Sequence, residues 1–177
     1  MMMRRIGLAI CLLLAACGRP APEAAESADS GNPLEVAARE RGIVRPEATD
    51  LTGVFERRHD LGRDAMCVVP DGTDRWRFAV TAAFGPGLSC EASGRIIRDG
   101  EGWRLDFAGA EGCSALVREE EDELQLPGGL PSQCDKLCPE RASLSGLRLP
   151  RASWAEGDAR RLQMKDKRGN VTMPCGA

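Results

Sequence analysis

The chain has 177 residues, which is room for one domain of ordinary size. It carries 24 Lys and Arg against 27 Asp and Glu, a formal net charge of −3, and this balance argues against a nucleic-acid binder that works through gross positive charge. One His and no Tyr are present, so few side chains suit general acid–base catalysis. We therefore expect a protein that is not an enzyme, with no catalytic residues, no cofactor and no bound metal.

The first sixteen residues have the pattern of an export signal. Arg4 and Arg5 give a short basic start, and Ile6–Ala16 follows as eleven apolar or small residues. A transmembrane helix needs about twenty apolar residues, so the shorter stretch is typical of the hydrophobic region of a signal peptide. We expect residues 1–16 to be removed during export.

The end of that stretch carries a more specific motif. Leu14-Ala15-Ala16-Cys17-Gly18 resembles the lipobox of bacterial lipoproteins. In that family the Cys thiol is alkylated by diacylglycerol, the signal is cut just before it, and the new amino terminus is acylated. The resemblance implies that Cys17, rather than Cys11 within the apolar stretch, carries fatty acyl chains such as palmitate and anchors the protein to a membrane. Because Gly18 and not Asp follows the Cys, the resemblance favours the periplasmic face of the outer membrane.

Residues 17–48 are expected to link the anchor to the folded body. Gly18–Gly31 is rich in Ala, Pro, Glu and Ser and has no apolar periodicity, a composition typical of a flexible tether. Asn32–Gly42 predicts a short helix with a capping Asn, a Pro in the first turn and a Gly at its exit. Residues 49–177 then form the predicted β domain, which ends in a basic segment.

From residue 51 the hydrophobic period changes to two, which predicts strands. The predicted strands cover residues 51–57, 65–69, 75–82, 88–98, 103–107, 113–119, 123–126 and 142–149, with a bulge near Ser145-Gly146 in the last. Short turns join them and no long helix intervenes, so the sheet should be antiparallel. Such a meander removes its edges by curling or closing. We expect a mainly β fold, a calycin-like barrel or strongly curved sheet, with a two-sheet sandwich as the alternative.

The seven aromatic residues mostly fall on inward-facing positions of these strands. They are Phe55, Trp76, Phe78, Phe84, Trp103, Phe107 and Trp154. Protein pockets are few, so we expect these side chains to pack in the core rather than to form a ligand cage.

Six cysteines remain after the signal and the lipobox. They are Cys67, Cys90, Cys113, Cys134, Cys138 and Cys175. In an exported chain six Cys predict three disulfides, with 15 possible connectivities. Zinc sites favour two close pairs such as C-x₂-C, whereas this chain has one close pair with its members four residues apart. The pattern therefore favours disulfides over a metal.

The predicted strand register suggests one of the three pairs. Folding the chain about the turn at residues 99–102 brings Cys90 opposite Ala110 and therefore near Cys113 at the open end of that hairpin. We expect Cys90 and Cys113 to form a disulfide.

The other four cysteines leave two alternatives. If Cys134 and Cys138 lie on a regular helical turn, their Cβ atoms are about 5–6 Å apart, whereas a disulfide needs about 3.8 Å. The two then take different partners, and Cys67 and Cys175 are available. If the turn is distorted, Cys134 pairs with Cys138 and Cys67 pairs with Cys175.

Charged residues supply the remaining candidates. His59 lies in a charged turn and is expected to be a solvated loop residue, since one His makes neither a triad nor a metal site. Outward residues such as Arg95 and Arg104 are expected to form cross-strand salt links.

An acidic hairpin tip is a candidate contact for a cationic envelope protein. It consists of Glu119, Glu120, Glu121, Asp122 and Glu123. The basic segment Arg148–Arg168 is expected to be a solvated helix–loop segment, with pairing to this tip, or contact with anionic lipid or polysaccharide, as the alternatives.

The body resembles two families of envelope inhibitors in architecture. Membrane-bound lysozyme inhibitors are small, lipidated, disulfide-bearing β-barrels with a Ser-Gly segment that enters the enzyme's cleft; Ser93-Gly94 and Ser145-Gly146 are present here, without that family's Tyr. Barrel-shaped inhibitors of secreted metalloproteases begin with a strand that Leu51–Phe55 loosely resembles. The resemblance implies a non-catalytic binding or inhibitor module. The alternative is a structural or assembly factor of the outer membrane.

Overall fold

The computed structural model describes residues 33–41, 50–166 and 168–176. The predicted signal peptide, Cys17 and the predicted tether lie outside these ranges. The helix expected around residues 32–42 is present as α1 (Pro33–Glu40). Within the described ranges, no helix combines the length and the apolar character needed to cross a bilayer.

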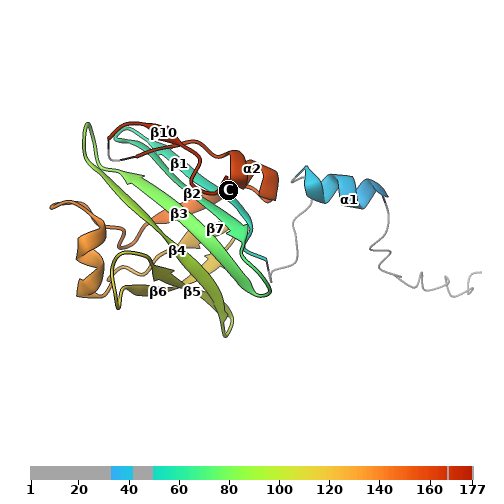
Figure 1. Cartoon of the computed structure of the whole chain (residues 1–177), viewed down its shortest axis with the longest axis horizontal. Helices are drawn as coiled ribbons and strands as arrows, with labels where there is room; N and C mark the ends of the chain where they lie inside the picture. The colour runs from blue at the N-terminus through green and yellow to red at the C-terminus, as the bar shows by residue number, and fades with distance from the viewer. Residues whose placement is uncertain (1–32, 42–49, 167, 177) are drawn as a thin grey trace, which may run out of the picture. The chain divides into compact units, whose positions relative to one another are not determined.

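Eight antiparallel strands close into a barrel in which each strand pairs with the next, and the eighth pairs with the first (Figure 1). They are β1 (Gly53–His59), β2 (Gly62–Pro70), β3 (Arg75–Ala83), β4 (Ser89–Asp99), β5 (Gly102–Phe107), β6 (Ser114–Glu120), β7 (Glu123–Gln125) and β8 (Arg148–Ser153). The mainly β antiparallel barrel predicted from the alternating pattern is confirmed. The two-sheet sandwich is not formed.

Alternate residues of the strands fill the barrel interior. The rings of Phe78 and Phe107 meet edge to face with centroids 5.4 Å apart. Five of the seven aromatic side chains are buried, as predicted, while Phe84 and Trp154 are partly buried. The interior is therefore a packed core, as is usual for a barrel of eight strands.

The last predicted strand is wrong in its bounds. Residues 142–147 form a loop, and the strand runs from Arg148 to Ser153. The expected bulge is a turn in which Gly146 has a φ of +70° and its N–H donates to the Pro127 carbonyl at 2.7 Å. Leu144 and Leu147 are buried as expected, but they close one barrel end rather than line a strand. A short apolar run does not distinguish these two roles.

The C-terminal segment, residues 155–166 and 168–176, covers the outer face of the first three strands. It holds α2 (Glu156–Arg161), β9 (Met164–Lys165) and β10 (Val171–Thr172). A second core forms where its apolar side chains meet the outward side chains of β1, β2 and β3: Ala159, Leu162, Met164 and Cys175 against Val54, Ala65, Cys67, Val69 and Ala79. This contact explains why β2 is apolar on both faces.

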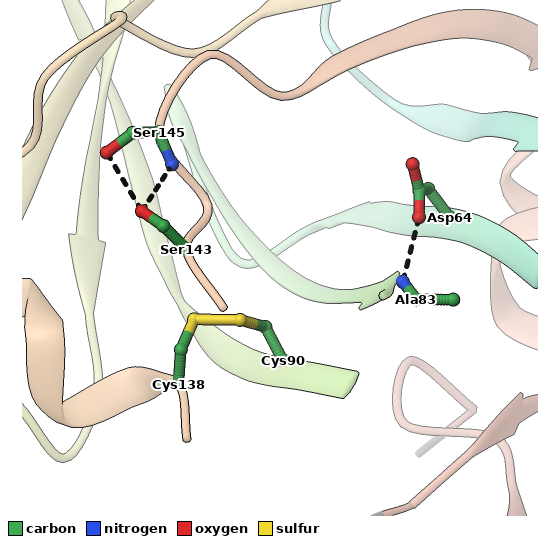
Figure 2. Close-up of a disulfide and its surroundings, with 6 residues drawn as sticks. All are labelled: Asp64, Ala83, Cys90, Cys138, Ser143 and Ser145. Carbon is green, nitrogen blue, oxygen red and sulfur yellow. Dashed lines mark hydrogen bonds between the residues drawn. A yellow bond between two sulfur atoms is a disulfide. The ribbon is translucent and has the colours of Figure 1, made fainter. Parts of the chain in front are cut away.

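Three disulfides hold these layers together, which confirms the predicted disulfide framework. Cys67–Cys175 joins β2 to the C-terminal segment across 108 residues. Cys90–Cys138 and Cys113–Cys134 attach the region of the short helix η1 (Ser132–Leu137) to one end of the barrel. Figure 2 shows the first of these two at the start of β4.

The predicted pair Cys90–Cys113 is wrong. Both residues lie at the same barrel end, as expected, but the chain from residue 126 to residue 147 folds over that end and brings one Cys to each of them. Neither of the two alternatives for the other four cysteines holds in full. Cys134 and Cys138 take different partners, as in the first alternative, but those partners are Cys113 and Cys90. Cys67 pairs with Cys175, as in the second alternative. The register of the hairpin about residues 99–102 could not show that residues 126–147 lie over the same barrel end and supply the two partner cysteines.

Gly94 allows a close approach of β5 to β4. A Cβ at this position would collide with the Asp106 carbonyl oxygen and lie 3.0 Å from Cε1 of Phe78. We expect Gly94→Ala to lower the free energy of unfolding by about 1–3 kcal/mol, because backbone must move to admit the methyl group. Urea unfolding followed by Trp fluorescence measures this. Gly128→Ala, where nothing lies within 4 Å, is the control, and equal stability of the two variants would contradict the close approach.

Candidate functional site

One end of the barrel is closed by a buried ion pair between β6 and β8. Arg151 Nε lies 2.6 Å from Oε1 of Glu119, and Nη2 lies 2.7 Å from Oε2. Arg151 Nη1 also donates to the Thr52 carbonyl at 2.7 Å, and the guanidinium lies 4.2 Å from the Phe55 ring centroid. The two side chains are 1% and 9% exposed. Pairing of the basic segment with the acidic tip, the alternative to a solvated segment, is thus present in this pair.

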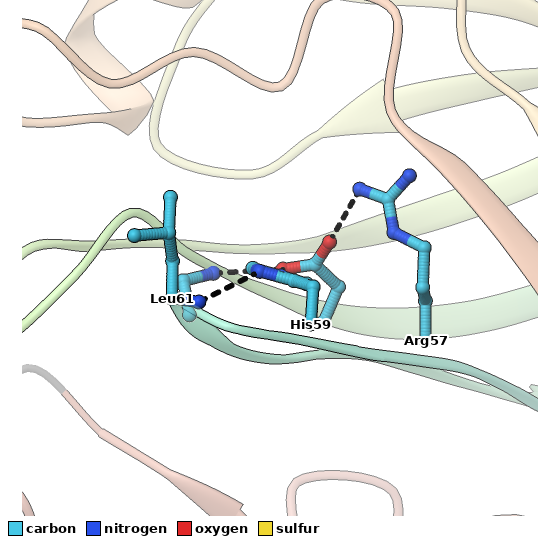
Figure 3. A network of polar contacts seen from close by, with 5 residues as sticks. Arg57, His59 and Leu61 are labelled. Carbon is cyan, nitrogen blue, oxygen red and sulfur yellow. Dashed lines mark hydrogen bonds and ion pairs between the residues drawn. The ribbon is translucent and has the colours of Figure 1, made fainter.

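The opposite end holds a second charged cluster around Asp64, near the start of β2. Figure 3 shows Arg57 and His59 of this cluster with Leu61. Arg57 Nη2 donates to Oδ2 of Asp64 at 2.8 Å, and His59 Nε2 lies 3.0 Å from Oδ1. The N–H of Ala83 donates to the same Oδ1 at 2.9 Å (Figure 2). Asp64 is 2% exposed, so these contacts compensate a buried carboxylate.

His59 is not the solvated loop residue that the sequence suggested. It is the last residue of β1 and is half-buried. The Leu61 N–H donates to its Nδ1 at 3.3 Å, so the ring proton lies on Nε2 and is donated to Asp64. Both ring nitrogens therefore have hydrogen-bond partners within the protein. The local sequence gave no sign of Asp64 as its partner, because the pair forms only when β1 and β2 fold together.

The Asp64 cluster predicts a dependence of stability on pH. Burial alone would raise the pKa of Asp64, but the hydrogen bond to His59, with those to Ala83 and Arg57, outweighs burial and holds the pKa below the ordinary value of 3.8. A carboxyl with a lower pKa when folded stabilises the fold when ionised. This stabilisation is present above about pH 3.8 and is lost as the pH falls through the lowered, folded pKa.

We therefore expect Asp64→Asn to flatten the acid side of the stability profile. The free energy of unfolding of the natural protein should fall more steeply between about pH 4 and about pH 2 than that of the variant. Urea unfolding at a series of pH values measures the two slopes. Asp60→Asn, at an exposed residue of the adjoining turn, is the control, and equal slopes for all three proteins would contradict the role of Asp64.

The acidic tip is a tight turn between β6 and β7. Glu121 and Asp122 have φ values of 51° and 64°, the left-handed conformation of a two-residue hairpin turn. The Asp122 carbonyl accepts a hydrogen bond from the Arg151 N–H, and Glu119 is held by the Arg151 side chain. Glu120 and Glu121 are exposed, while Asp122 and Glu123 are partly buried. Contact of this tip with a partner stays a prediction.

Two adjoining hollows lie on the outer wall beside the C-terminal segment. One hollow, of about 390 Å³, faces β3 and β4. The other, of about 550 Å³, faces the first residues of β2 and the last residues of β3. They share Thr81 and residues 164–166 as walls. Their walls combine apolar residues such as Ala79 and Met164 with polar ones such as Thr81 and Lys165.

Two further hollows continue along the outer wall over β3, β4 and β5. Their volumes are about 430 and 520 Å³, and both reach Gly94, Arg95 and Ala108. The cross-strand salt link expected for Arg104 is present with Asp99 of β4 at 3.3 Å, and Arg104 also lies 3.5 Å from Asp106 of its own strand. The link expected for Arg95 is absent from the described residues, because Asp106, which lies opposite it in the register, contacts Arg104 instead.

Comparisons of the chain with models of protein families, with curated proteins and with solved structures found no match. Among the residues that the structure describes, no three His, Cys, Asp or Glu side chains gather as ligands for a metal ion. The six cysteines expected as disulfide partners are all bonded in pairs, so none of them offers a thiolate to a metal.

Proposed function

We propose that the protein is a lipid-anchored envelope module that binds a partner on the outer wall of its barrel and does not catalyse a reaction. One observation carries this proposal: the interior is filled by side chains, while the four hollows described above lie on the outer wall. The carboxylates buried at the two barrel ends, Asp64 and Glu119, already have arginine partners. These groups support the fold rather than a reaction.

The anchoring part of the proposal rests on the sequence. The lipobox-like Leu14-Ala15-Ala16-Cys17 follows an apolar stretch of the length that signal peptides use. Three disulfides favour a compartment where thiols oxidise. A module fixed to the periplasmic face of the outer membrane would meet both conditions.

Photo-crosslinking in cells tests the proposed binding. A photoreactive residue at Thr81 or Ser93, which line the outer-wall hollows, should give a discrete cross-linked product. The same residue at Leu116, which is exposed on β6, is the control. Equal products from all three positions, or none, would contradict a binding surface on this wall.

Enzyme assays test the narrower idea of an inhibitor. The purified full chain should reduce the activity of a lysozyme or a secreted metalloprotease in proportion to its concentration if it belongs to that functional class. No effect at micromolar concentration would remove the inhibitor from the proposal and leave the binding module.

A structural or assembly factor is the second candidate, favoured by the exposed Glu120 and Glu121 at the hairpin tip. A photoreactive residue at Glu121 should then give the stronger cross-link. Neutralisation by Glu120→Gln and Glu121→Gln should abolish it. A cross-link at Ser93 that survives this neutralisation would favour the outer-wall binding module instead.

A further inference from the structure

Three arginines gather on the outer face of two neighbouring strands. Arg75 and Arg77 belong to β3 and Arg95 to β4, and the register places Arg77 directly opposite Arg95 and Arg75 opposite Ile97. Residues two apart on a strand share a face. All three side chains therefore belong to the outer wall, outside the packed core. We call them the arginine cluster.

No carboxylate of the described residues forms an ion pair with a member of the arginine cluster. Arg77 donates to the Cys175 carbonyl at 3.1 Å, a neutral acceptor. The neighbouring Arg104 is different, because it contacts both Asp99 and Asp106. The cluster thus forms no ion pair within 4.0 Å among the described residues, although the register places Asp106 of β5 opposite Arg95.

This arrangement costs stability. Like charges directly opposite each other in an antiparallel pair repel, and Arg77 and Arg95 occupy such positions. Proteins keep local conflicts of this kind mostly at functional sites. An anion held between the two guanidinium groups would turn the repulsion into attraction.

The hollows beside the cluster give such an anion room. One of about 430 Å³ is bordered by Arg77, Arg95 and the chain at Pro174–Cys175, and one of about 520 Å³ is bordered by Arg75 and Arg95. Arg95 is common to both. Asp71 also lines the first hollow and Asp106 the second, so each hollow has two arginines beside one carboxylate and keeps an excess of positive charge.

We propose that Arg75, Arg77 and Arg95 form a binding site for a soluble phosphate-bearing small molecule. The planar guanidinium fork matches the spacing of phosphate oxygens and binds them through two hydrogen bonds at once. The border formed by Pro174 and Cys175 makes the site a recess beside the C-terminal segment, which suits a small ligand better than a flat surface. This inference rests on the proposed binding function and names its ligand class.

Titration of the full chain in nanodiscs of neutral phosphatidylcholine tests the proposal. Inorganic phosphate and glycerol phosphate are added at constant ionic strength, and binding is followed by calorimetry and by the arginine Nε–H resonances. We expect saturable binding that Arg95→Gln weakens at least tenfold, a difference of about 1.4 kcal/mol. Arg118→Gln removes an equal charge at an exposed position of β6 and should leave the affinity for phosphate unchanged.

Thermal unfolding separates binding from folding. Arg95→Gln removes the repulsion between Arg77 and Arg95, so the melting temperature of the variant should equal or exceed that of the natural protein.

Several outcomes would contradict the proposal or part of it. No saturable binding, or equal weakening by Arg95→Gln and Arg118→Gln, would overturn the proposal. So would perturbation of the Arg95 resonance by phosphatidylglycerol nanodiscs alone, which would assign the cluster to a membrane surface. A Ser93 cross-link that persists without phosphate binding would leave the binding module in place and refute its ligand class.

Discussion

Replacing Arg151 by Met should lower the free energy of unfolding by about 3–5 kcal/mol, because it leaves the Glu119 carboxylate buried without its partner. The guanidinium donates twice to that carboxylate and once to the Thr52 carbonyl. It is 1% exposed, so water does not replace it. Urea unfolding followed by Trp fluorescence measures the loss.

A double-mutant cycle separates the charge from the packing. Glu119→Leu combined with Arg151→Met removes both buried charges and should recover much of the lost stability. Arg161→Met is the matched control, because Arg161 and its partner Asp158 are 74% and 48% exposed, and it should change stability by less than about 0.5 kcal/mol. If Arg151→Met is as mild as Arg161→Met, the buried pair does not close the barrel end as described.

Removal of the Cys67–Cys175 disulfide should be the second large effect. Replacing both residues by Ala should lower the free energy of unfolding by about 2–5 kcal/mol, since the bond closes a loop of more than a hundred residues. Detachment of the C-terminal segment also exposes the second core on the outer wall. Urea unfolding measures the first effect, and limited proteolysis after the arginines of α2 measures the second.

The control is removal of Cys113–Cys134, which spans 21 residues. The chain-entropy term is smaller for the shorter loop, and the C-terminal segment should stay protected from protease. A C-terminal segment that resists cleavage equally in both variants would contradict its attachment through Cys175.

The alternation of apolar and polar residues was enough to predict most of the barrel. In β3 and β5 one face of the strand is apolar and the other is polar, and both strands formed within one residue of the predicted bounds. The β8 region differed because Leu144 and Leu147 are apolar for another reason: they plug a barrel end. The second core was missed because its side chains in the C-terminal segment are separated by charged residues, which hid their common face.

Long-range contacts explain the errors at the charged groups and cysteines. His59 and Asp64 are five residues apart, yet their contact requires a hairpin that brings both toward the barrel end. The partners of Cys90 and Cys113 belong to a segment that follows β7 and returns over the barrel. For the arginine cluster, the sequence indicated that Arg95 points outward. That Arg75 and Arg77 lie beside it, and that Arg95 forms no ion pair although Asp106 lies opposite, became visible only in the folded structure.

The most direct test is mass spectrometry of the protein isolated from its own cells, digested without reduction. We predict that its amino-terminal peptide begins at Cys17 with acyl chains attached. The same digest should contain peptides linked through Cys67–Cys175, Cys90–Cys138 and Cys113–Cys134. An amino terminus that keeps residues 1–16, together with free thiols at these six positions, would contradict a lipid-anchored, disulfide-bonded barrel.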